Sequence, residues 1–375
     1  MSQRILICCG AGGVGKTTTS AALALQLALD GYKVGVITID PARRLADALG
    51  LQDLTNAPQT VSLAQIDADC TGRLDAMMLD MKATFDSIIS RHAPDAEVEE
   101  KLLHSRYYRF VSEKLAGSHE YMAMERLYQL HTDSDYDIIV VDTPPAQNAM
   151  DFLRAPQRLA SVMSEAVVKW MSLPKDRVGF RILERGSHTV MAVLKKLAGQ
   201  ETVTEIAEFF SLISELAEGF RERSLEMMEL LKSDTTNFVL IGSASPASRA
   251  ESIRFLAMLK DHDLPYGGAI VNRVHAYPQH ANALDDSAFP DRPAEVDQST
   301  WKDLCGGVAK LPALQQRLAE GDAQYCQAIA SDAPTWTVPR LSIDIHDLHS
   351  LAQVSNHLQA AAQDLASPNL GSAAD

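Results

Sequence analysis

The sequence predicts an α/β fold: a mostly parallel sheet flanked by helices, with an α-helical insertion subdomain. Short apolar runs, typical of strands buried on both faces, alternate with stretches of helical periodicity. Several of these runs end in glycines, aspartates or asparagine, as strands do where they reach a ligand. Between about residues 151 and 235 strand signals are absent and only helical patterns occur.

We therefore expect strands at residues 5–9, 33–39, 61–67, 136–142, 237–242, 268–274 and 335–339. Helices are expected at 20–29, 45–49, 247–262, 311–329 and 345–358. Helical insertions are expected at about 72–133 and 151–235, within one domain spanning 1–375. The aperiodic segment 277–300 predicts a flexible excursion, and 367–375 a frayed tail.

Composition narrows the possible partners and compartment. A net charge of −15 argues against a nucleic-acid partner, because phosphate backbones need a basic surface. No apolar stretch reaches the roughly 20 residues of a membrane span. The first predicted strand leaves no room for a signal peptide, and the 5 cysteines form no C-x-x-C pair. These features favour a reduced, cytoplasmic protein.

The phosphate-loop pattern G-x-x-x-x-G-K-[ST] is complete between the first strand and the following helix. Glycines allow backbone N–H groups to point at phosphate oxygens, and the helix N-terminus adds its positive dipole end. We expect Lys16 to reach the β- and γ-phosphates and the Thr17 hydroxyl to bind Mg²⁺. A glycine-rich turn without nucleotide is the alternative. The flanking strand and helix favour a nucleotide site made by Gly10, Ala11, Gly12, Gly13, Val14, Gly15, Lys16, Thr17 and Thr18.

Two aspartates follow other predicted strands. Asp40 ends the second strand, and Asp142 ends an apolar run as in a Walker B strand. Because ligands bind beyond the carboxyl ends of parallel strands, both carboxylates should lie near the phosphates. Asp142 is expected to hold Mg²⁺; a cap on the following turn is the alternative.

The helical insertion carries many apolar residues. Methionine and aromatic stripes at helical spacing are usually core. A self-packed helical subdomain and a groove for a hydrophobic client both remain open.

With these motifs, the chain resembles the ArsA/Get3 family of ATPases, in the deviant-Walker-A group of P-loop NTPases, over nearly its whole length. The likeness depends on the phosphate loop and on residues 38–49, which match the family's switch I. Residues 142–145 stand in the switch II position. Residues 270–273 are similar to the segment that contacts adenine, and 338–341 to the loop over the base.

The resemblance implies a dimeric ATPase that uses ATP and Mg²⁺. Asp40 would polarise the attacking water, and Lys16 would serve the γ-phosphate. Asn272 would contact adenine, and Pro339 would lie in the loop over the base.

Three departures from the family pattern are visible. The group's signature lysine, donated across the dimer, is here Ala11. The C-x-x-C that holds a dimer zinc in eukaryotic Get3 is missing, and no cysteine cluster resembles the metalloid site of ArsA. Cys8 and Cys9 should point to opposite faces of their strand and cannot chelate together.

Three functions are compatible with these residues. The first is an ATP-hydrolysing switch, acting as a dimer on a hydrophobic or membrane-protein client. The second is a weakly hydrolysing, nucleotide-sensing subunit that forms a heterodimer with a lysine-bearing paralogue. The third, a surface-patterning ATPase similar to MinD or ParA, is disfavoured because the chain is acidic and its closing helix lacks a basic face. We favour the first.

Overall fold

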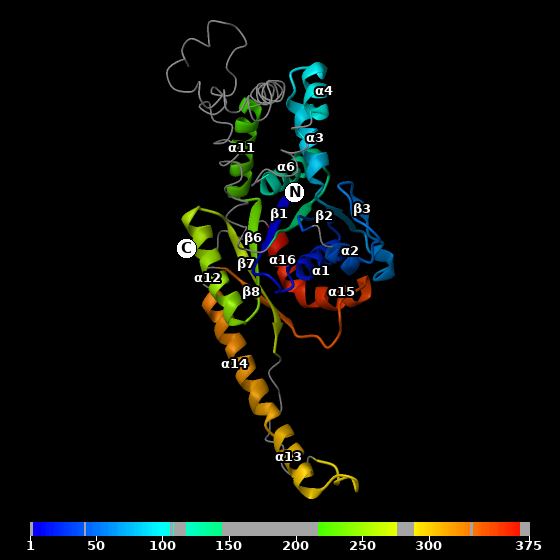
Figure 1. Cartoon of the computed structure of the whole chain (residues 1–375), viewed down its shortest axis with the longest axis vertical. Coiled ribbons are helices and arrows are strands. Elements are labelled where there is room, and N and C mark those ends of the chain that lie inside the picture. The colour runs from blue at the N-terminus through cyan, green and yellow to red at the C-terminus, as the bar shows by residue number, and fades with distance from the viewer. Residues whose placement is uncertain are drawn as a thin grey trace, which may run out of the picture.

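The computed structural model describes residues 3–40, 43–105, 108, 118–144, 217–275, 289–330 and 333–367. Within these residues, eight strands form one sheet in the order β3-β4-β2-β5-β1-β6-β7-β8 (Figure 1). All neighbouring strands are parallel except β3, which is antiparallel to β4. The predicted α/β class and mostly parallel sheet are thus confirmed.

The middle of the sheet explains the apolar runs in the sequence. Every residue of β1 (Arg4–Cys9), β5 (Ile138–Asp142) and β6 (Thr236–Gly242) is buried. Helices cover both faces of these strands, so side chains on either face of the sheet are shielded from water. The other strands are β2 (Lys33–Thr38), β3 (Gln59–Thr60), β4 (Arg73–Met78), β7 (Tyr266–Val274) and β8 (Thr335–Pro339).

Two apolar cores lie on the two faces of the sheet, and alternate residues of each strand enter them. The first core is closed by α1 (Lys16–Leu29), α2 (Arg44–Leu49), α15 (Leu348–Ser355) and α16 (Gln359–Ala366). The second is closed by α3 (Met81–His92), α4 (Ala96–His104), α6 (Ser118–Asp133), α11 (Ala217–Lys232), α12 (Pro246–Asp261) and α14 (Leu311–Ile329). Cys8 packs in the first core and Cys9 in the second, so they do point to opposite faces.

Helices extend beyond the sheet at both ends of the molecule. Helices α3, α4 and α11 rise at one end, while α13 (Gln298–Val308) continues from α14 at the other (Figure 1). No helix in the described residues combines the length and the apolar character that crossing a membrane requires.

Two expected elements are wrong. Residues 73–78 form strand β4 and not the start of a helix, because Leu74 enters one core and Met77 the other. Residues 61–67 were expected to form a strand, but the strand is β3 at Gln59–Thr60, followed by a single 3₁₀ turn, η1 (Leu63–Gln65). Only Val61 extends the pairing, through its N–H and the carbonyl of Leu74 at 2.8 Å.

The predicted flexible excursion at 277–300 overlaps the start of α13. There the Asp297 carboxylate accepts hydrogen bonds from the backbone N–H groups of Ser299 and Thr300, each at 3.0 Å, which caps the helix. The closing helix at 345–358 is instead α15, a short 3₁₀ turn, η5 (Asn356–Leu358), and α16. Most of the second insertion (145–216), residues 276–288 and the tail from 368 lie outside the described residues.

Candidate functional site

The phosphate loop joins the central strand β1 to α1. Its glycines meet specific backbone demands: φ is +78° at Gly13 and +90° at Gly15, where other residues are strained. At Gly10, a Cβ atom would come within 1.9 Å of the Ile241 carbonyl oxygen on β6. The sequence therefore folds into a tight turn directly against the sheet, with Gly12 and Gly13 exposed at its tip.

Lys16 is the first residue of α1 and curls back into this turn. Its Nζ donates a hydrogen bond to the Ala11 carbonyl at 3.1 Å, and its side chain is almost fully buried. Burial lowers the pKa of Lys16, while Asp142, Cys9 and Asp40 nearby act in the opposite direction. A cation held within a backbone turn is suited to bind phosphate oxygens.

Ala11 itself faces inward. It is 7% exposed and packs in the same core as Val14 and α1. The position at which the resemblance implies a lysine is thus filled by a buried methyl group.

Asp142 ends β5 between the ends of β1 and β2, opposite Cys8 and Thr38 in the strand registers. Its Oδ2 accepts a hydrogen bond from the Thr38 hydroxyl at 2.9 Å. Its Oδ1 is buried and has no hydrogen-bond partner among the described residues. A buried acceptor left in this way is costly, so the second oxygen is available to a cation.

Burial raises the pKa of Asp142 to about 6, against the opposing influence of the Thr17 and Thr38 hydroxyls and of Lys16. Thr17, half-buried at the start of α1, therefore lies close to the Asp142 carboxylate. Hydroxyl and carboxylate oxygens are hard ligands of the kind Mg²⁺ prefers, usually from one or two side chains together with phosphate oxygens. These residues fit a magnesium ion.

Asp40 follows β2 at the same edge. Its carboxylate lies 3.4 Å from Arg44 Nη1 and is 29% exposed, so water can reach it. Its negative charge favours the protonated form of both Lys16 and Asp142, so the three ionisable groups lie close together. Pro41 and Ala42, which follow Asp40 in the switch I pattern, lie outside the described residues.

Asn272 comes from β7, far away in the sequence, and contacts the phosphate loop. Its Nδ2 donates to the Val14 carbonyl at 2.9 Å, and its Oδ1 accepts from the Arg273 N–H at 2.9 Å. A Cβ at Gly15 would meet this amide nitrogen at 2.5 Å. The amide thus supports the loop; its predicted contact with adenine stays a prediction. Pro339 ends β8 beside β7, paired with Val274 at the same sheet edge.

Two residues of this site were not predicted. Thr38 begins the predicted switch I segment, but its side chain was given no role, because that role depends on β2 lying next to β5. Glu251 on α12 favours the charged form of Lys16, and its Oε2 is buried without a hydrogen-bond partner among the described residues. Neither could be found without the strand order.

Comparisons with known proteins show which sequences this chain is similar to. The sequence profile of the family described as "Anion-transporting ATPase" matches residues 3–303. "ATPase GET3" of Malassezia globosa is 26% identical over 274 residues, covering 73% of each chain. "ATPase get3" of Aspergillus terreus is 25% identical over 280 residues, 74% of each chain. "ATPase ASNA1 homolog" of Cryptosporidium parvum is 24% identical over 266 residues, 71% of this chain and 63% of its own.

Proposed function

This chain belongs to the anion-transporting ATPase family and hydrolyses ATP, and we propose that it does so as a magnesium-dependent dimeric switch acting on a hydrophobic client. One observation carries the proposal. Lys16, Asp40 and Asp142 come from three separate segments and meet at the carboxyl edge of the sheet, around the phosphate loop. Phosphoryl transfer requires mainly positioning and charge neutralisation, which this arrangement supplies.

The roles follow from the surroundings of each group. Lys16 binds the phosphates from inside the loop. Thr17 and Asp142 would hold Mg²⁺, which neutralises charge on the phosphates when bound. Asp40 is partly exposed, so its carboxylate can accept a hydrogen bond from water and orient it.

Helices α6 and α11 connect the helical part of the chain to the strands of the site. Helix α6 leads to β5 and so to Asp142, while α11 leads to β6. Between the two helices, Arg223 donates hydrogen bonds to the fully buried Glu125 at 3.2 Å and stacks on the Tyr128 ring at 3.9 Å. A buried ion pair of this kind resists separation, because removing one partner strands the other charge. The pair therefore links movement of one helix to the other.

A second function is favoured by one specific residue. Because residue 11 is alanine, this chain supplies no cation from that position to a partner's phosphates. A paralogue with lysine there would supply a cation in trans, as an arginine finger does. The chain would then act as the nucleotide-sensing half of a heterodimer. We place either form in the cytoplasm, in keeping with five free cysteines.

Hydrogen exchange tests the switch. In the Asp40→Asn variant, amide exchange in α6 and α11 should differ between protein saturated with ATP and protein saturated with ADP. The Lys16→Ala variant, which cannot hold the phosphates, should show no difference. Identical exchange in the two nucleotide states would contradict the switch. Turnover that appears only after a lysine-bearing paralogue is added would favour the second function.

A further inference from the structure

Helix α13 and the first half of α14 form an arm, residues 298–318, that stands away from the sheet (Figure 1). None of the α13 residues is buried, and the buried side chains of α14 start only at Ala319. The two residues between the helices, Ala309 and Lys310, keep right-handed helical backbone angles. The arm is therefore an almost continuous helix without a covering element among the described residues.

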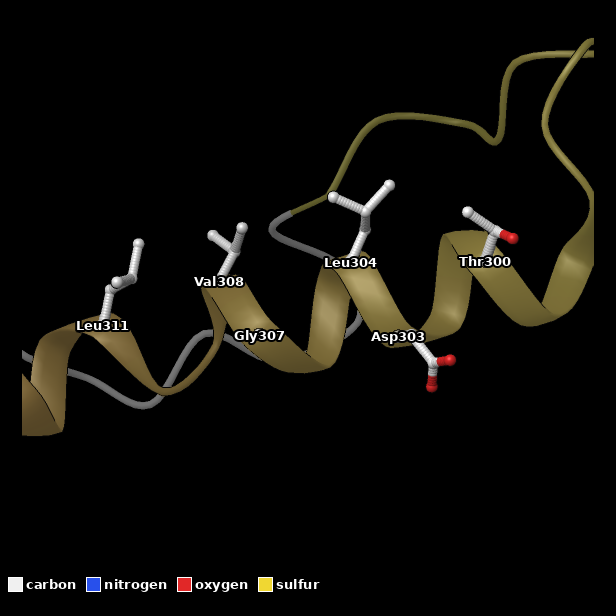
Figure 2. A pocket seen from close by; sticks show the side chains of 6 residues that line it. All are labelled: Thr300, Asp303, Leu304, Gly307, Val308 and Leu311. Carbon is white, nitrogen blue, oxygen red and sulfur yellow. The ribbon is translucent and has the colours of Figure 1, made fainter.

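One side of this arm is apolar. Five of the eight large hydrophobic side chains that are exposed in the described part of the chain lie here, each 39–53% exposed: Leu304, Val308, Leu311, Leu314 and Leu318. Figure 2 shows Leu304, Val308 and Leu311 projecting from one side of the helix, over an open hollow of about 500 Å³. We call these five residues the stripe. Such a patch on a charged protein marks a surface that binds a partner.

The spacing of the stripe indicates what that partner is. Its steps of 4, 3, 3 and 4 residues average 3.5, the period at which one helix packs along another. The spacing is symmetric about Leu311: the intervals are 3 and then 4 residues in both directions along the helix. Turning a second arm around by a two-fold axis at Leu311 sets Leu304 against Leu318, and Val308 against Leu314. A surface that is complementary to itself in this way is what a two-fold dimer requires.

The charges beside the stripe agree with this pairing. Asp303 and Arg317 each directly precede a stripe leucine, on the same flank, near opposite ends of the arm. In an antiparallel pair, Asp303 of each copy lies beside Arg317 of the other. Lys310 lies near the axis, where its long side chain can extend into solvent.

We propose that the stripe is a dimer seam, in which the arms of two copies of this chain pack antiparallel around Leu311. The seam spans only about 21 Å of helix, which is short for a coiled coil that forms alone. It therefore adds to other contacts between the copies.

Hydrogen bonds connect the base of the arm to the strand that contacts the phosphate loop. His275, just after β7, donates its backbone N–H to Asp322 of α14 at 2.6 Å, and its ring Nδ1 lies 2.9 Å from the same oxygen. Three residues earlier, Asn272 holds the Val14 carbonyl of the phosphate loop. A change in the loop can thus reach the arm through one strand. This dependence on nucleotide rests on the proposed function; the seam itself does not.

Sedimentation velocity of the full chain tests the seam. With magnesium and ATP, the wild type should be a dimer, and the Leu311→Glu/Leu314→Glu variant should associate about 100-fold or more weakly, because four carboxylates would be buried. Ala313→Glu, on an exposed position away from the stripe, should stay dimeric. Circular dichroism checks that each variant folds. A monomeric wild type, or an undiminished dimer in the double variant, would overturn the proposal.

Crosslinking and charge exchange give independent outcomes. In a Cys305→Ala background, Leu311→Cys should form an intermolecular disulfide under mild oxidation, and Ala313→Cys should not. Arg317→Asp should weaken association roughly five- to twenty-fold through two exposed pairs, and Asp303→Arg/Arg317→Asp should restore it. Equal crosslinking at both positions, or no restoration, would contradict an antiparallel seam. Absent ATP turnover would refute the proposed function without affecting these outcomes.

Discussion

The Thr38 hydroxyl donates a hydrogen bond to Asp142 Oδ2 at 2.9 Å, at the adjacent ends of β2 and β5. The same hydroxyl oxygen accepts a weaker bond, at 3.3 Å, from the backbone N–H of Asp40. One side chain therefore connects the aspartate that would orient water with the aspartate that would hold the metal. Movement of either switch segment must strain or break this connection.

Replacing Thr38 by valine keeps its shape and removes both bonds. We expect ATP turnover to fall roughly tenfold, because one buried hydrogen bond to a charged group contributes about 1.5 kcal/mol. Thr38→Ser should retain most activity. Steady-state turnover at saturating magnesium checks this, and equal turnover in Thr38→Val and wild type would show that the connection has no part in catalysis.

The raised pKa of Asp142 predicts a pH dependence of stability in metal-free protein. Between pH 4 and 6 the folded protein keeps the Asp142 proton while the unfolded chain loses it, so the folded state binds more protons. The free energy of unfolding should therefore fall as pH rises through this window, by about 3 kcal/mol for a shift of roughly two units.

Urea unfolding of wild type and Asp142→Asn in EDTA isolates this effect, because other titrating groups cancel in the difference. Wild type should lose stability relative to Asp142→Asn as pH rises from 4 to 7. If the difference does not change with pH, Asp142 lacks the buried and poorly paired position that the structure gives it.

The bond between Asn272 and Val14 predicts how Asn272 affects nucleotide binding. Asn272→Ala removes the support of the phosphate loop, so affinity should weaken about tenfold for ATP and equally for GTP. If Asn272 instead recognises adenine directly, only ATP binding should suffer. Titration calorimetry with both nucleotides distinguishes the two roles.

The inward position of Ala11 predicts that a lysine cannot simply be restored there. Ala11→Lys must either bury a charge or displace the loop, so we expect a loss of at least about 1–3 kcal/mol of stability. Turnover should fall with it. Chemical unfolding and turnover of this variant check the point; unchanged stability with faster turnover would show that the loop accepts the family's lysine.

Local patterns predicted much of the fold. The helix at 311–329 and the strand at 335–339 have the predicted bounds, because periodicity, prolines and apolar content within each segment determine them. Strand β4 was missed because Met77, Met78 and Met81 suit a helical spacing, and only pairing with β2 makes residues 73–78 a strand. Helix α13 was missed because its exposed apolar side resembles no buried pattern.

The site, too, has parts that local sequence predicts and parts that it does not. The phosphate loop and the two strand-end aspartates are recognisable because each belongs to a short motif. The bonds that join them, from Thr38 to Asp142 and from Asn272 to Val14, cross 104 and 258 residues of sequence. Such contacts depend on strand order, which no local pattern contains.

The most direct test is ATP turnover by the purified chain alone, with and without magnesium. We predict magnesium-dependent hydrolysis that Lys16→Ala and Asp40→Asn each reduce at least about 100-fold, while Asp261→Asn, at an exposed aspartate that ends α12, leaves it unchanged. Asp40→Asn should still bind ATP. Hydrolysis that survives Lys16→Ala and Asp40→Asn, or that needs no magnesium, would contradict the account.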